Sequence, residues 1–447
     1  MTRLAVHTLG CKVNQVEGES IADVASRRGI DATADPARAD VIVLNTCAVT
    51  RAADLEAGQM ARRFRRENPG AVIVLTGCYA QTRPEEAARL PVDHVIGHAG
   101  KDRIAAELET LAARGRLDRP EVRVGRVLRD RRLPVFEVSG RPLPARTRRM
   151  VKVQDGCDVF CSFCIVPHAR GLPRSARAED VLAELDRHRK EGAREIVLTG
   201  PHIGSWGRDL DPPSRLADLL ARVWQVSGFT RVRLSSMEPS EFDEGVIAVI
   251  GEHPEVFCDH LHIPLQSGSD GVLRRMRRPY DAASFRAVTD RFARALPDIG
   301  IGTDVIAGFP GETERQFEET LRLLEESPVS FFHVFPFSPR EGTPAAKYAD
   351  PRPPELIRER AARLRDLGRR KRRAFIGRFV GRSLEVLPEV RVPGGRLRGY
   401  SRNYIPVEIE GEGARENEPV DVRVESVIQG GPQGWPEDGR VIGRVIE

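Results

Sequence analysis

The chain has 447 residues, of which 40% are hydrophobic and 30% are charged, a balance that is typical of a globular protein and excludes a disordered one. Its length exceeds what one hydrophobic core usually supports, so we expect two or three domains. No apolar run is long enough to span a bilayer, and the first residues lack the apolar stretch of a secretory signal, so we expect a cytoplasmic protein without a membrane partner.

Between residues 1 and 112, short β-branched runs alternate with helical patterns, which predicts an open parallel α/β sheet. The expected strands are Leu4–Leu9, Val41–Asn45, Ala71–Thr76 and Val92–Ile96. Residues 113–147 are rich in Arg and Pro and have no clear period, so we expect a connector with one β-hairpin there.

Three cysteines of this first region, Cys11, Cys47 and Cys78, are far apart in sequence, yet each follows an expected strand. The carboxyl ends of parallel strands lie along one edge of a sheet, so the three thiols can converge on one site. The alternative is three independent buried thiols, which is common for cysteine. Seven cysteines in a cytosolic chain favour metal ligation over disulfides, because that compartment keeps thiols reduced.

Residues 148–350 resume the alternation with six strand-helix units. The expected strands are Met150–Gln154, Glu195–Thr199, Arg231–Ser235, His260–Ile263, Gly300–Ile306 and Phe331–Phe335. Six units are too few for the eight-stranded barrel, which predicts an open, partial (βα)6 barrel. Ligand sites are expected where its strands end.

The segment Cys157-Asp-Val-Phe-Cys161-Ser-Phe-Cys164 follows the first strand of this expected barrel. Three thiolates at such spacing can hold an iron-sulfur cubane and leave one iron open to a ligand. A structural zinc site is the alternative, since His168 would complete a Cys3His set. Cys258 has no cysteine at comparable spacing and is expected to be a core thiol.

The C-terminal part carries most of the basic excess. The net charge is only +5, but residues 352–374 hold ten Lys and Arg against three Asp and Glu. We expect a basic helix over residues 351–374 that contacts polyanion phosphates, with a merely solvated helix face as the alternative. The residues expected to bind RNA there are Arg369, Arg370, Lys371, Arg372 and Arg373.

Residues 375–447 show short β runs with glycine turns, at Ser383–Leu387, Val407–Ile409 and Val420–Val427, which predicts a small β-barrel. Its Tyr400, Arg402 and Tyr404 combine aromatic and basic groups suited to stacking on RNA bases and to phosphate contact. The alternative places the tyrosines in the core of the barrel.

The spacing C-x3-C-x2-C, with an aromatic residue before the last cysteine, resembles the signature of the radical S-adenosylmethionine superfamily. The segments TLGCKVNQ, LNTCAVT, TGCYAQ and QDGCDVFCSFCIVPHARGLPRS resemble the methylthiotransferase family, and the likeness covers nearly the whole chain. This resemblance implies two 4Fe-4S clusters and bound S-adenosylmethionine. It assigns an auxiliary cluster to Cys11, Cys47 and Cys78 and a radical-generating cluster to Cys157, Cys161 and Cys164, and it makes the C-terminal barrel a small RNA-binding (TRAM) domain.

Further residues are expected to bind the cofactor because they lie where strands of the barrel end. Gly200, within TGPHIGSWG, follows the second strand, where relatives carry a motif that contacts the methionine amino group, and a plain Gly-Pro turn is the alternative. The others are Ser236 and Glu238 after the third strand, Gln266 after the fourth, and Asp304 and Gly308 at the end of the fifth.

Branches of the family differ in substrate, and the phrase GCKVNQ resembles the branch that acts on threonylcarbamoyladenosine next to the anticodon of tRNA. Val16 departs from that branch, in which an aromatic residue often follows the Asn-Gln pair. The resemblance implies tRNA and an electron donor such as flavodoxin or ferredoxin as partners, and not DNA. Alternatives are methylthio transfer to isopentenyladenosine of tRNA or to a ribosomal-protein aspartate, and a zinc-stabilised RNA-binding module without catalysis.

Overall fold

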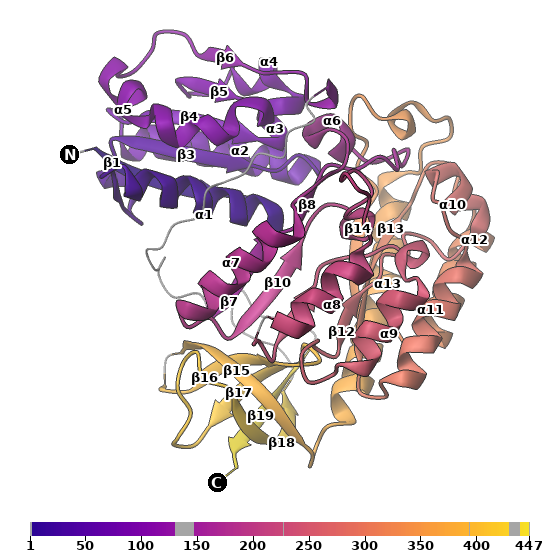
Figure 1. Cartoon of the computed structure of the whole chain (residues 1–447). Coiled ribbons are helices and arrows are strands. Elements are labelled where there is room, and N and C mark those ends of the chain that lie inside the picture. The colour runs from indigo at the N-terminus through magenta and orange to yellow at the C-terminus, as the bar shows by residue number, and fades with distance from the viewer. Residues whose placement is uncertain (1, 130–146, 227, 393, 429–438, 447) are drawn as a thin grey trace.

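The computed structural model describes residues 2–129, 147–226, 228–392, 394–428 and 439–446. Three folded parts follow one another along the chain: a parallel sheet, a half-barrel and a small closed barrel (Figure 1). The sheet and the small barrel lie at opposite ends of the half-barrel (Figure 1). No helix among the described residues is long and apolar enough to cross a membrane.

The N-terminal sheet has six parallel strands in the order β2-β1-β3-β4-β5-β6, which confirms the predicted open α/β sheet. They are β1 (Arg3–Thr8), β2 (Asp31–Ala32), β3 (Val41–Thr46), β4 (Val72–Gly77), β5 (His94–Ile96) and β6 (Glu121–Arg123). β3 and β4 are buried along their whole length, as their continuous Val, Ile and Leu runs require of central parallel strands.

Helices cover both faces of this sheet. α1 (Lys12–Arg27) and α5 (Ile104–Arg114) pack on one face, where Ile21 and Leu108 are buried. α2 (Arg51–Glu67) packs on the other face through Phe64, and the short helices α3 (Cys78–Thr82) and α4 (Pro84–Ala87) follow β4.

The described part of the connector, residues 113–129, contains no hairpin. Its residues Glu121–Arg123 form β6, which pairs in parallel with β5 and extends the sheet past residue 112. The sequence of β6 has only one apolar side chain, so it does not show with which strand β6 pairs. That pairing depends on the sheet edge that lies beside it in the fold. Residues 130–146 lie outside the described residues.

The central part is an open half-barrel of six parallel strands, as predicted. β7 (Arg148–Lys152), β10 (Glu195–Thr199) and β11 (Val232–Leu234) form one sheet, and β12 (His260–His262), β13 (Gly300–Ala307) and β14 (Phe331–Pro336) form another. A parallel bridge between Val232 and Phe257 lies at the seam between the two sheets.

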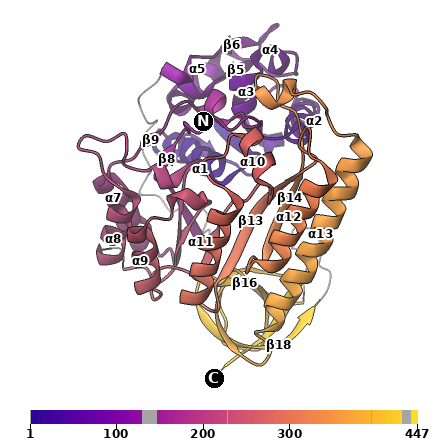
Figure 2. The same ribbon diagram turned by 90° about the vertical axis from the view of Figure 1, so that its right-hand side faces the viewer.

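Helices surround the half-barrel on its outer side (Figure 2). They are α7 (Ala178–Lys190), α8 (Leu216–Val226), α9 (Glu244–Glu252), α10 (Asp270–Met276), α11 (Ala282–Ala295), α12 (Glu314–Glu326) and α13 (Pro354–Gly377). α13 contains the expected basic segment and runs beside α12 to the small barrel (Figure 2). After β7, the hairpin of β8 (Gln154–Asp155) and β9 (Arg174–Ser175) encloses α6 (Val166–Arg170).

The C-terminal strands close into a barrel in the order β15-β16-β17-β19-β18, which confirms the predicted small β-barrel. They are β15 (Ser383–Arg391), β16 (Leu397–Ser401), β17 (Pro406–Glu410), β18 (Val420–Ile428) and β19 (Arg440–Val445). Val386, Val407, Val422 and Val441 fill its core. β16 and β19 were not among the expected strands, because glycine and arginine interrupt their apolar alternation.

A buried ionic cluster joins the half-barrel to the small barrel. Glu195 of β10 accepts hydrogen bonds from Arg233 Nε at 2.6 Å and from Arg231 Nε at 2.9 Å. Both guanidinium groups reach on to the small barrel, where Arg231 pairs with Glu385 at 2.7 Å and Arg233 donates to the carbonyl oxygen of Ser401 at 2.8 Å. This cluster fixes the small barrel at the end of the half-barrel where the strands begin.

Candidate functional site

Cys11, Cys47 and Cys78 lie at the carboxyl edge of the N-terminal sheet, directly after β1, β3 and β4, and are called the auxiliary set below. Two glycines with φ of +98° allow the close approach of these chain segments. A Cβ on Gly10 would lie 2.5 Å from the Cβ of Cys47, and one on Gly77 would lie 2.3 Å from a carbonyl oxygen of β3. Larger residues at either position would push the cysteines apart.

The thiols of the auxiliary set suit a metal cluster. Burial raises the pKa of the Cys47 thiol and raises the pKa of Cys78 to about 12, and a negative charge on Cys11 would raise both further. These two thiols therefore stay protonated near neutral pH unless a metal supplies positive charge, because a bound metal deprotonates its thiol ligands. The auxiliary set could therefore hold a metal or a metal cluster.

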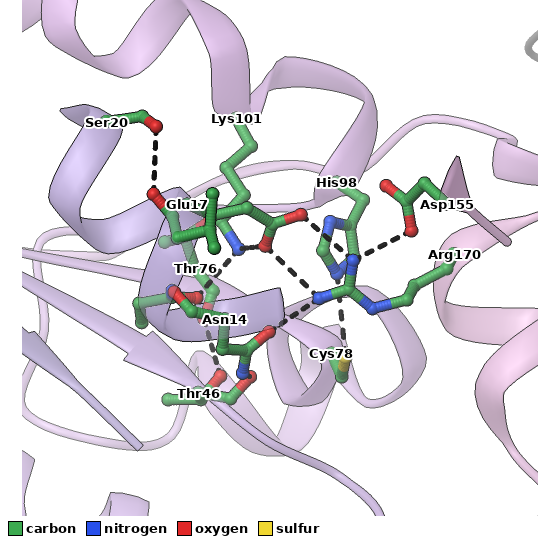
Figure 3. A network of polar contacts seen from close by, with 12 residues as sticks. Asn14, Glu17, Ser20, Thr46, Thr76, Cys78, His98, Lys101, Asp155 and Arg170 are labelled. Atoms are coloured by element: carbon green, nitrogen blue, oxygen red, sulfur yellow. Dashed lines mark hydrogen bonds and ion pairs between the residues drawn. The ribbon is translucent and has the colours of Figure 1, made fainter. Parts of the chain in front are cut away.

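A network of buried charges lies beside Cys78 of the auxiliary set (Figure 3). Arg170 of α6 donates to Glu17 Oε1 and to Asp155 Oδ1, each at 2.9 Å, and to Asn14 Oδ1 at 2.6 Å. Lys101 forms a second ion pair with Glu17. Glu17 and Lys101 belong to the N-terminal part of the chain, and Arg170 and Asp155 belong to the half-barrel part. The network therefore holds these two parts in contact.

The same network sets the charge around the thiols. Burial alone would raise the pKa of Glu17, but Arg170 and Lys101 outweigh it and hold that pKa well below its ordinary value. Burial, with Lys101 and Arg170, lowers the pKa of His98, whose Nε2 lies 3.5 Å from Cys78 Sγ (Figure 3). The neutral imidazole of His98 and the guanidinium of Arg170 thus lie beside the auxiliary set, whose thiols would become anionic if a cluster bound.

Cys157, Cys161 and Cys164, called the loop set below, lie between β8 and α6. Burial raises the pKa of Cys161 to about 11 and also raises the pKa of Cys164, which lies near the other two cysteines. Arg278 Nη1 donates to Cys161 Sγ at 2.9 Å and pairs through its other nitrogen with Glu238 at 2.6 Å. A guanidinium in this place stabilises the thiolate that a cluster requires.

A cationic imidazole completes the surroundings of the loop set. His202 pairs with Glu241, and its ring lies near Cys157. Burial alone would lower the pKa of His202, but these two contacts outweigh it and raise the pKa to about 10. His202 and Arg278 are functional candidates that the sequence reasoning missed, since neither belongs to the cysteine spacing.

Neither cysteine set is arranged as a closed zinc site. Four ligand atoms around tetrahedral zinc lie within about 4 Å of one another. Among the described residues, only His262, Asp304 and His333 bring three candidate ligand atoms within 4.8 Å of one another, so neither cysteine set is drawn that closely together. The ring of His168 packs against Phe160, with centroids 6.0 Å apart.

A cavity of about 180 Å³ connects the two parts that carry the cysteines. Cys164 and Phe163 line it from the loop set, and Val49 and Thr50 line it from the segment after Cys47. Two of the residues predicted to bind the cofactor, Gln266 and Asp304, also line this cavity. Gln266 has a positive φ of 65°. Burial alone would raise the pKa of Asp304, but His262 at 2.9 Å and His333 at 3.2 Å hold it below its ordinary value.

The other predicted cofactor residues do not line this cavity. Gly200 follows β10, and a Cβ there would lie 2.7 Å from the carbonyl oxygen of Gln154, so the turn requires glycine. Glu238 contacts the loop set through Arg278, and Ser236 lies half-buried just after β11. Gly308 follows β13 with a φ of +76°, and a Cβ there would lie 2.5 Å from the side chain of Ile357 of α13, so this glycine has a structural role.

Residues expected to bind RNA on α13 differ in their surroundings. Lys371 donates to the carbonyl oxygens of Leu324 and Glu325, each at 2.9 Å, and so caps the C-terminus of α12. Arg369 pairs with Asp366, Arg370 pairs with Glu325 at 3.0 Å, and Arg372 lies 5.0 Å from the ring centroid of Phe331. Arg370 and Arg373 are exposed and remain suited to phosphate contact.

The predicted RNA-binding residues of the small barrel lie at its junction with the half-barrel. Arg402 donates to the carbonyl oxygens of Thr230, Pro254 and Phe257, the last at 2.9 Å, so its guanidinium is engaged in domain contact. The rings of Tyr400 and Tyr404 stack with centroids 4.8 Å apart. Neither ring belongs to the barrel core, so the alternative placement of the tyrosines is not observed.

Comparisons with known proteins agree with this geometry. The radical SAM superfamily matches residues 151–324, which include the loop set, and the family described as Uncharacterized protein family UPF0004 matches residues 3–97, which include the auxiliary set. The solved structure of the radical S-adenosylmethionine methyltransferase TsrM from Kitasatospora setae is similar in fold, with a TM-score of 0.56 and 14% identity over 75% of this chain and 73% of that one.

Two curated relatives cover most of the chain. Threonylcarbamoyladenosine tRNA methylthiotransferase MtaB of Bacillus subtilis is 37% identical over 100% of this chain and 98% of its own length. The tRNA-2-methylthio-N(6)-dimethylallyladenosine synthase of Thermobifida fusca is 39% identical over 86% of this chain and 77% of its own length. The first relative matches the whole chain, and the second shows that a branch with another substrate is nearly as similar.

Proposed function

Because the chain belongs to the radical S-adenosylmethionine methylthiotransferase family, we propose that it adds a methylthio group to N6-threonylcarbamoyladenosine of tRNA. One observation carries the proposal: a single cavity is lined both by Cys164 of the loop set and by the residues that follow Cys47 of the auxiliary set. Such a cavity suits a reaction in which a radical formed at one cluster and sulfur held at the other reach one substrate atom.

When bound, two 4Fe-4S clusters and S-adenosylmethionine would supply the radical cleavage, the sulfur and the methyl group. The protein's own residues position these groups and keep water away. Arg278 and His202 stabilise thiolates of the loop set, and Arg170 holds the two parts at a fixed separation. Phe163 and Ile306 give the cavity an apolar wall.

The proposal includes tRNA as substrate, an electron donor such as flavodoxin or ferredoxin, and action in the cytoplasm. Its substrate branch is tested by nucleoside analysis of tRNA from a strain that lacks this gene. We expect loss of 2-methylthio-N6-threonylcarbamoyladenosine and unchanged 2-methylthio-isopentenyladenosine, with restoration by the wild-type gene and not by the Cys47→Ala variant. Loss of the isopentenyl derivative alone would assign the chain to the other branch.

A further inference from the structure

A second and larger cavity, of about 490 Å³, lies where the three parts of the protein meet. Its volume is within the range of about 300 to 1,000 Å³ that is typical of small-molecule sites. Lys12 and Gln15 line it from α1, Met150, Val197 and Leu234 from the half-barrel, and Glu389, Val390 and Tyr404 from the small barrel.

The lining has an excess of positive charge. Lys12, Arg148 and Arg233 face the cavity, and Glu389 is the only carboxylate among the lining residues. Arg148 pairs with Glu389 at 3.1 Å, and Arg233 is neutralised by Glu195 outside the cavity. Among the described residues, no carboxylate or carbonyl accepts a hydrogen bond from Lys12, whose ammonium lies near both arginines. The cavity therefore offers an uncompensated cation to an anionic ligand.

One wall of the cavity is held in a rare backbone conformation. Tyr404 has a φ of +67°, a left-handed value that bulky residues seldom adopt and that tends to occur at functional sites. Its ring stacks between those of His260 and Tyr400, with centroids 4.5 Å and 4.8 Å away, and its hydroxyl accepts a hydrogen bond from Arg148 at 3.4 Å. The ring is thus fixed in place before any ligand binds.

The cavity is linked to the auxiliary set through Lys12. Lys12 directly follows Cys11 of the auxiliary set. Along β7, Arg148 and Met150 line the cavity. Lys152, which belongs to the buried network beside Arg170, lies about 7 Å beyond Met150 at the rise of an extended chain. A substituent of a substrate bound between the cysteine sets would have to pass beside Lys12 to reach this cavity.

We propose that this cavity binds the carboxylate of the threonylcarbamoyl substituent, with Lys12 as its counter-ion. The inference rests on the proposed function and names its specificity determinant. The threonine moiety carries one carboxylate and one methyl group, and Val197 and Leu234 offer apolar contact to the methyl group. An isopentenyl substituent in the same place would bury Lys12 without an anion, at the cost of desolvating an unpaired charge.

The test compares Lys12→Met, which keeps the length of the side chain and removes its charge, with Lys12→Arg as the matched control. Reconstituted enzymes of equal iron content are assayed anaerobically on anticodon stem-loops that carry threonylcarbamoyladenosine. We expect kcat/KM to fall about 10- to 100-fold for Lys12→Met, as for the loss of one charge-assisted hydrogen bond, and to be largely retained for Lys12→Arg. An unchanged kcat/KM for Lys12→Met would overturn the proposal.

A backbone phosphate of the RNA could occupy the same cavity, and two further substrates distinguish the sources. The first of these substrates carries the methyl ester of the threonylcarbamoyl group, which has no carboxylate. Wild-type enzyme should modify this ester as poorly as Lys12→Met modifies the free acid. Lys12→Met should modify the ester and the acid equally well. If Lys12→Met weakened binding of unmodified and modified stem-loops equally, the anion would be a phosphate and the carboxylate assignment would be wrong. If wild-type enzyme failed to modify threonylcarbamoyladenosine, the proposed function itself would fail with the inference.

Discussion

Replacing Glu195 by Gln tests whether the buried ionic cluster holds the small barrel in place. The side chains of Glu195 and Arg231 are fully buried, and that of Arg233 is 3% exposed. The amide retains the shape of the carboxylate and removes its charge, so two buried guanidinium groups lose a shared counter-ion. Both groups also donate to the small barrel, so the loss should loosen the contact between the parts.

The magnitude follows from the pKa of Glu195. Burial alone would raise this pKa, but Arg233 and Arg231 outweigh burial and lower it to about 2, from an ordinary value of 4.5. The difference corresponds to roughly 3 kcal/mol, in line with about 3 to 5 kcal/mol for breaking a buried ion pair. Because the folded pKa is lowered, this stability is present above pH 4.5 and is lost as the pH falls toward 2.

Hydrogen exchange of the β16 amides measures the local opening free energy. We expect Glu195→Gln to lower it by roughly 3 kcal/mol at pH 7. The matched control is Glu179→Gln, which removes an exposed ion pair with Arg222 at 2.7 Å and should leave the local opening free energy nearly unchanged. Equal protection in the two variants would refute the reasoning, as would a wild-type protein that keeps its full protection below pH 4.

Three further outcomes are expected. Anaerobically reconstituted protein should bind about eight irons, and a triple Cys→Ala variant of the loop set should bind about four and should not cleave S-adenosylmethionine. Cys47→Ala should abolish methylthio transfer and retain measurable cleavage; loss of both activities with an intact loop cluster would contradict separate roles for the two sets. The double change Arg370→Gln and Arg373→Gln should flatten the slope of log tRNA affinity against log salt by about 1 to 2 units, whereas Lys371→Gln should lower the melting temperature and leave the slope unchanged.

The sequence predicts the cysteine sets well because strand ends are a property of local pattern. β3 and β4 are continuous apolar runs, and the residue after each is visible in the sequence. Parallel pairing then brings the ends to one edge without further information. The half-barrel was predicted from the alternation of short strand patterns with helical patterns along residues 148–350.

Partners of single charged residues are not predictable in this way. Lys371 lies in a run of basic residues, yet it caps α12, and Arg402 lies between aromatic residues, yet it donates to carbonyl oxygens of the half-barrel. A run of basic residues in the sequence shows how many cations are present. It does not show which carbonyl or carboxylate group each of them contacts in the fold. Arg278 and His202 were missed for the same reason, because their contacts to the loop set join residues from separate loops.

The two buried ionic networks fix the arrangement of the three parts in the same way. Burying charges contributes little net stability, because desolvation offsets the attraction, but breaking a buried pair is costly. Glu17 with Arg170 and Glu195 with Arg231 therefore penalise any other arrangement of the three parts more than they stabilise this one. A reaction that needs two cysteine sets on one cavity, and a second cavity lined by all three parts, depends on such a fixed arrangement. We infer that these networks are retained for geometric specificity, so that their removal should impair transfer between the sets before it unfolds the protein.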